Sequence, residues 1–111
     1  MQQNKTLQFK YNMSDNYLVF EHNIDTCWLI EHYIDVEHIK IFILLLKEAI
    51  QELKKLNIKK FIQYVSGEDW TNFLENNNLW TMESENEDIK KISCNIDDTV
   101  ISISKGFGII E

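Results

Sequence analysis

Three histidines in the N-terminal part of the chain each follow a glutamate, a pairing that suits metal binding or general-base catalysis. The pairs are Glu21-His22, Glu31-His32 and Glu37-His38. A zinc site needs roughly three or four converging donors, and the spacing here fixes no third donor. His22 and His32 could approach each other on neighbouring antiparallel strands, so metal binding and general-base action by one imidazole are the alternatives. We interpret all three as surface or half-buried histidines and predict no metal site.

Two other groups of reactive side chains have simpler explanations. The segment ESENED, residues 83–88, contains four carboxylates but lacks the glycine and the distal glutamate of an EF-hand loop. It is therefore predicted to be a solvated hairpin turn. Cys27 and Cys94 are far apart and form no CxxC motif, which favours reduced, half-buried thiols on strands. No catalytic residue and no cofactor is predicted from these groups.

The charge of the chain argues against nucleic acid as a partner. The net charge is -7, and all eleven cationic residues are lysine. A polyanion is repelled by this charge, and without arginine there is no bidentate group for phosphate or guanine. The apolar run at residues 39–46 is too short to cross a bilayer, which needs about 20 apolar residues. With no apolar leader and reduced thiols, the sequence favours a cytoplasmic protein.

The hydrophobic pattern predicts an α+β fold, a single domain over residues 1–111 with residues 1–6 frayed. Period-2 alternation predicts a mostly antiparallel sheet of about six strands, and a period of 3.6 residues predicts two helices. The predicted strands cover residues 7–11, 17–21, 27–34, 58–65, 79–83, 90–96 and 99–104. The predicted helices cover residues 36–56, packed on one face of the sheet, and 67–77, on the other face or at an edge. Asp35 is expected to cap the long helix and Asn57 to end it.

The segment LLLKEAIQELKKLNIKKFIQYVSGEDWTNFLENNNLW, residues 44–80, resembles the central part of the GNAT acyltransferase fold. In that family a helix ends in a KKLGIKK segment before a strand, and the next helix ends in FYEKLGF. The matching stretches here are residues 54–60 and 73–79. The resemblance implies a GNAT-like arrangement of sheet and helices.

The residues that carry the family's chemistry are missing. The resemblance implies an acyl-CoA site in a glycine-rich loop before the long helix, where bare amides hold the pyrophosphate. Here that stretch is DVEHIKI, residues 35–41, with no Gly or Arg and with Asp35 and Glu37 where phosphates would approach. The tyrosine that donates a proton in the family corresponds to Leu74, and the N-terminal helices are absent. The resemblance thus implies a trimmed, non-catalytic relative.

The leading hypothesis is a non-enzymatic interaction or structural module that contacts a protein partner or itself, because the apolar stripe of the long helix is unusually wide. The candidate interface residues are Ile41, Leu44, Leu45, Phe107, Ile109 and Ile110. The bias toward Ile, Asn and Lys is typical of AT-rich codons and indicates a low-GC genome, such as that of certain bacteria, phages or large viruses, rather than a function. A small phage or viral component acting in the host cytoplasm or virion is one form of this hypothesis. An acyl-CoA-dependent N-acyltransferase with a divergent cofactor site is the alternative, and a small metal-binding protein comes third.

Overall fold

A computed structural model describes residues 4–11, 14–66 and 78–108. The strands are β1 (Lys5–Lys10), β2 (Tyr17–His22), β3 (Thr26–Tyr33), β4 (Lys60–Ser66), β5 (Thr81–Glu85) and β6 (Ile89–Asn95). The helices are the 3-10 turn η1 (Val36–His38), α1 (Ile39–Lys55), the 3-10 turn η3 (Ile96–Asp98) and α2 (Thr99–Gly106). No helix among the described residues is long and apolar enough to cross a membrane.

The described strands form one six-stranded sheet in the order β1-β2-β3-β4-β6-β5. β3 and β4 pair in parallel, and the other four pairs of neighbours are antiparallel. The helix α1 connects the two parallel strands, as such a crossover requires. This arrangement confirms the predicted α+β fold with a mostly antiparallel sheet. β1 begins at Lys5, earlier than the predicted fraying of residues 1–6 allows.

The long helix follows from its sequence pattern. Asp35 caps the preceding turn η1, with its side chain accepting a hydrogen bond from the Glu37 amide. Asn57 takes a positive φ of 66° just after the helix, a conformation that Asn tolerates better than most residues. One face of α1 is buried, comprising Phe42, Ile43, Leu45, Leu46, Ala49, Ile50 and Leu53. The predicted end at Asn57 is therefore confirmed, whereas Asp35 caps the 3-10 turn and α1 itself begins at Ile39, three residues later than predicted.

The prediction of a strand at residues 99–104 is wrong, because Thr99–Gly106 forms the helix α2. The segment TVISIS alternates and is rich in β-branched residues, which mimics a strand. Its buried positions nevertheless follow a helical spacing: Thr99, Ser102, Ile103 and Gly106 are buried while Ile101 is 51% exposed. The turn η3 directly before it, with Asp97 and Asp98, directs the chain into a helix.

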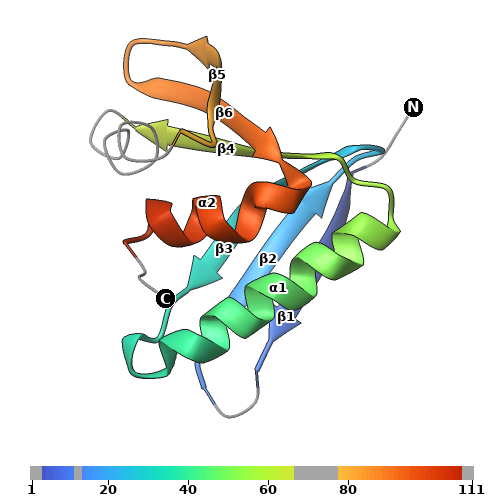
Figure 1. The fold of residues 1–111 in the computed structure, drawn as a ribbon, viewed down its shortest axis with the longest axis vertical. Coiled ribbons are helices and arrows are strands. Elements are labelled where there is room, and N and C mark those ends of the chain that lie inside the picture. Colours follow the sequence, from blue (N-terminus) through green and yellow to red (C-terminus); the bar gives the residue numbers. More distant parts are fainter. Residues whose placement is uncertain (1–3, 12–13, 67–77, 109–111) are drawn as a thin grey trace.

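Both described helices lie on the same face of the sheet (Figure 1). The core between helices and sheet contains Phe20, Phe42 and Phe61, all fully buried. The second helix predicted from the sequence, residues 67–77, lies outside the described residues.

Candidate functional site

The parallel strands β3 and β4 stay paired for only part of their length. Their register covers three residue pairs, from Thr26 opposite Lys60 to Trp28 opposite Ile62. Beyond these pairs, β3 continues to Tyr33 and β4 to Ser66. A β-bulge at Ile30, the extra residue between the partners of Val19 and Phe20, bends β3 at this point. Residues 29–33 of β3 and residues 63–66 of β4 do not pair with each other, and we call these two segments the β3–β4 divergence.

The helix α2 crosses the divergence on the helix side of the sheet (Figure 1). At its start, the Cys94 sulfur of β6 lies 3.3 Å from the Ser102 hydroxyl and 3.9 Å from that of Thr99. At its end, the Phe107 ring lies 4.7 Å from the His32 ring of β3 and 6.3 Å from the Phe42 ring of α1. Side chains of this chain therefore fill the space between β6, α1 and the end of β3.

Side chains of Asn16, Asp35 and His38 form hydrogen bonds at the turn that leads into α1. One oxygen of Asp35 accepts from the Glu37 amide at 3.1 Å, and the other lies 2.9 Å from Nδ1 of His38. The buried Asn16 side chain accepts from the Asp35 amide at 2.6 Å and donates to the His38 carbonyl at 2.9 Å. The His38 hydrogen bond, aided by the Glu37 amide, lowers the pKa of the Asp35 carboxyl. The Glu37 amide thus already donates to the Asp35 carboxylate and is not free for an incoming anion.

The same turn contains the one group of possible metal ligands found among the described residues. Ligand atoms of Asp35, Glu37 and His38 lie within 4.8 Å of one another. These three could hold a cation, but Asp35 and His38 already satisfy each other. The approach of His22 and His32 considered as an alternative does not occur, because His22 lies opposite Cys27 and His32 opposite Leu18, at different ends of the β2–β3 pairing.

The two thiols are buried and poorly reactive. Burial, aided by the charge of Cys94, raises the pKa of the Cys27 thiol to about 12. Burial also raises the pKa of Cys94, although hydrogen bonds from Ser102 and Thr99 partly oppose this. Neither thiol has the exposure or low pKa of a catalytic cysteine.

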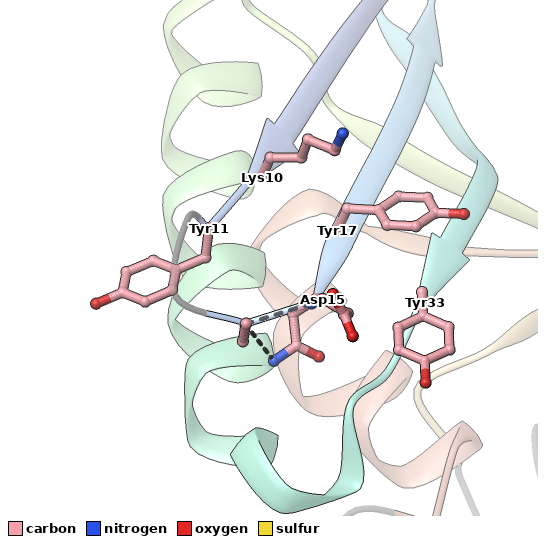
Figure 2. A pocket seen from close by; sticks show the side chains of 7 residues that line it. Lys10, Tyr11, Asp15, Tyr17 and Tyr33 are labelled. Atoms are coloured by element: carbon pink, nitrogen blue, oxygen red, sulfur yellow. Dashed lines mark hydrogen bonds between the residues drawn. The ribbon is translucent and has the colours of Figure 1, made fainter.

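A second feature, not predicted from the sequence, lies where β1 and β3 end and β2 begins. An open hollow of about 550 Å³ is lined by Lys10, Tyr11, Ser14, Asp15, Asn16, Tyr17 and Tyr33. Figure 2 shows Tyr17 and Tyr33 beside each other on β2 and β3, with Tyr11 pointing away. The two rings stack at 6.4 Å, and a hydrogen bond with Glu31 raises the pKa of the Tyr17 hydroxyl. Only the β2–β3 register brings these tyrosines together, so no local motif could have identified them.

The predicted interface residues differ in how far they are exposed to solvent. Leu44 is 63% exposed, whereas Leu45 is 5% exposed and belongs to the core. Ile41 and Phe107 are partly buried against that core. Ile109 and Ile110 lie outside the described residues. Leu44 is therefore the member of this set that is freely available for contact in the described part of the chain.

The sheet surface that faces away from α1 and α2 also carries large side chains. Because side chains alternate along a strand, the neighbours of the core residues Cys27 and Phe61 point to this opposite side. They include Trp28 and Ile62, which are partly exposed, and Tyr64, which is 58% exposed. We call the surface of Tyr17, Val19, Trp28, Ile62 and Tyr64 the outer face.

The sequence matches no protein-family model and no curated protein. The structure is similar to the crystal structure of the PaiA N-acetyltransferase from Thermoplasma acidophilum in complex with coenzyme A. The TM-score is 0.59 at 19% sequence identity, over 81% of this chain and 60% of that chain. The chain thus has a GNAT-like acetyltransferase fold, which confirms the resemblance seen in residues 44–80. It spans less than two thirds of the length of that enzyme.

Proposed function

We propose that this protein is a non-enzymatic interaction or structural module built on an acetyltransferase-like fold. The observation that carries the proposal is the hydrogen bond from the Glu37 amide to the Asp35 carboxylate. A phosphate binds at a helix entrance through unoccupied amides and the positive end of the helix dipole. Here a negative side chain takes that amide, and Glu37 adds a second carboxylate beside it. The entrance therefore repels the group that an acyl-CoA donor would place there.

The position of α2 supports the same proposal. Its contacts with Cys94, His32 and Phe42 fill the space beside the β3–β4 divergence with side chains of this chain. A long cofactor arm would have to displace them. The acidic turn at Asp35 and the helix α2 together favour a protein with an acetyltransferase-like architecture but without a cofactor site.

The contact surface that we assign to the module is the outer face. It combines aromatic and aliphatic side chains, and interfaces are enriched in such aromatics. Self-association through this face is the simplest form of the proposal, and a larger assembly is the next. A small phage or viral component in the cytoplasm or a virion is one form that this module could take, since its residues of AT-rich codons are shared by phages, large viruses and certain bacteria. The net charge of -7 argues against nucleic acid as the partner.

Sedimentation velocity across a wide concentration range tests this role. The wild-type chain is expected to form a larger species reversibly, and Tyr64→Glu is expected to return it to the monomer, since a charge would be buried in the contact. Ile24→Glu is the matched control, because Ile24 is 65% exposed in the turn between β2 and β3, outside the outer face. A wild-type monomer at every concentration, or equal effects of both variants, would argue against the outer face.

The second candidate is an acyl-CoA-dependent N-acyltransferase with a divergent cofactor site. The likeness to an N-acetyltransferase structure that contains coenzyme A favours it. Such an enzyme would have to bind the pyrophosphate away from the Asp35 turn. Saturable binding of acetyl-CoA separates this candidate from the first.

A further inference from the structure

We propose that α2 is a reversible latch over the β3–β4 divergence, which opens after Ile96 while the sheet stays folded and thereby exposes the Cys94 thiol. This inference goes beyond the proposed function, because it concerns how one helix is held rather than what the protein binds. It is based on the length of α2, the chemistry of its buried side, its two attachment points and the group beneath it.

The length of α2 makes it dependent on packing. It has eight residues, and helices shorter than about 12 residues are marginal in water on their own. Four of its residues are β-branched, which lowers helix propensity further: Thr99, Val100, Ile101 and Ile103. Without its contacts, α2 is therefore expected to unfold locally.

The buried side of α2 provides little apolar contact. Thr99 and Ser102 are fully buried and Ser104 is 6% exposed, whereas the apolar Ile103 is the helix's one buried large hydrophobic residue. By contrast, α1 buries one Phe, three Leu, two Ile and one Ala side chain along its length. Because apolar burial is the main stabilising term, α2 is held more weakly than α1.

A buried oxygen without a hydrogen-bond partner among the described residues weakens the packing of α2 further. It is Oγ of Ser104, a residue that is 6% exposed. A buried unsatisfied polar atom is unfavourable relative to the same atom in water, so opening α2 relieves part of this cost.

Ile96, just before α2, is anchored to the rest of the protein, so α2 can open from this residue. Ile96 is 5% exposed, and its amide donates to the Lys59 carbonyl at 3.0 Å, which anchors η3 to the residue before β4. The next residue, Asp97, pairs with Lys54 at 2.6 Å on the surface, where both side chains are at least half exposed. Such an exposed pair contributes little. The hinge is therefore placed between Ile96 and Thr99.

The far end of the latch is held by Phe107. Its ring contacts His32 and Phe42 and is only partly buried. This aromatic contact attaches the end of the segment to β3 and α1, so truncating the ring should release α2 more than a change on its exposed side.

The group under the latch is the Cys94 thiol. It is 4% exposed, and its sulfur contacts the hydroxyls of Ser102 and Thr99, both on α2. When α2 leaves, Cys94 loses this cover while its strand remains paired with β4 and β5. Labelling of this thiol therefore reports the opening of the latch.

The test is iodoacetamide labelling of the full chain at increasing low urea concentrations, with modification at Cys94 and Cys27 quantified by peptide mass spectrometry. Opening of α2 exposes little surface, so the Cys94 labelling rate is expected to depend on urea much less than global unfolding does. Phe107→Ala is expected to raise that rate about tenfold, as expected for loss of a partly buried ring. Ile101→Ala, a change on the exposed side of α2, should leave it within about twofold.

The urea dependence decides between the outcomes. A Cys94 rate that rises as steeply with urea as global unfolding, in the wild type and in Phe107→Ala, would overturn the latch. If Phe107→Ala loses its native circular dichroism spectrum, Phe107→Leu is used in its place, with the same expected direction and a smaller effect. A shallow urea dependence that Phe107 variants shift and Ile101→Ala does not would establish it.

Discussion

The Asp35 carboxylate accepts a hydrogen bond from the Glu37 amide at 3.1 Å and pairs with His38 at 2.9 Å, at the turn that leads into α1. The same carboxylate therefore caps the helix entrance and blocks it to anions. The resemblance of residues 44–80 implies a phosphate-binding loop at this turn, and the local structure leaves no Glu37 amide free for a phosphate.

Replacing Asp35 should destabilise the protein. Asp35→Ala removes an acceptor from the Glu37 amide and from His38, and a lost cap lowers helix stability. We expect a lower urea midpoint with an unchanged urea slope, measured by circular dichroism. Glu37→Gln is the matched control, because it stays in the same turn and keeps the cap. Equal midpoints for wild type and Asp35→Ala would contradict the capping role.

The contribution of Asp35 should also depend on pH. Its pKa in the folded protein is below the ordinary value of 3.8, so the folded state favours the charged form. The stability gained from it is full above that value and is lost as the pH falls through the folded pKa. Urea denaturation of wild type and Asp35→Asn at pH 7 and at pH 3 measures this. The gap between the two proteins should narrow at pH 3; a constant gap would contradict the assignment.

His32 should respond to pH at a higher range. Partial desolvation lowers the pKa of His32, whose ring lies 4.7 Å from that of Phe107, below 6.5, so the folded state favours the neutral imidazole. The protein therefore has the full stability that depends on His32 above pH 6.5, where the imidazole is neutral. This stability is lost as the pH falls through the folded pKa. Thermal unfolding of wild type and His32→Gln between pH 7.5 and pH 5 tests this. Wild type should lose more stability than the variant, and a parallel decline in both would argue against a role for His32.

The core beneath the sheet should be sensitive to truncation at Phe61. This ring is fully buried and contacts Phe20 at 6.1 Å and Trp80 at 5.8 Å. Phe61→Ala is expected to lower the free energy of unfolding by about 3–5 kcal/mol, through lost burial and a cavity. Tyr64→Ala, on the exposed side of the same strand, should change it by no more than about 0.5 kcal/mol. Similar losses for both variants would contradict the assignment of the two faces of β4.

Much of the fold could be predicted because the deciding signals are local. Alternation identified β1 to β3, and the 3.6-residue period identified α1, with Asp35 capping the turn before it and Asn57 after its end. The helix α2 was missed because its alternating, β-branched residues match a strand equally well. Its buried serines and Thr99 face Cys94 only once β6 is in place, so tertiary contacts rather than local pattern decide its structure.

The candidate site was less predictable for the same reason. The absence of glycine at residues 35–41 could be read directly from the sequence. The contact of His32 with Phe107 and the stacking of Tyr17 on Tyr33 join residues that are distant in sequence. The width of the apolar stripe on α1 suggested Leu44 and Leu45 as surface residues, but α2 packs against α1, and Leu45 is buried in the core.

The most direct test of the central claim is calorimetric titration of the wild-type chain with acetyl-CoA, with Asp35→Gly as the comparison. If the acidic turn excludes the pyrophosphate, the wild type will give no saturable heat at millimolar ligand. Removing the Asp35 carboxylate frees the Glu37 amide, so any binding that emerges should appear in the variant. Saturable binding by the wild type, weakened by added inorganic pyrophosphate, would contradict a non-enzymatic module and favour the acyltransferase.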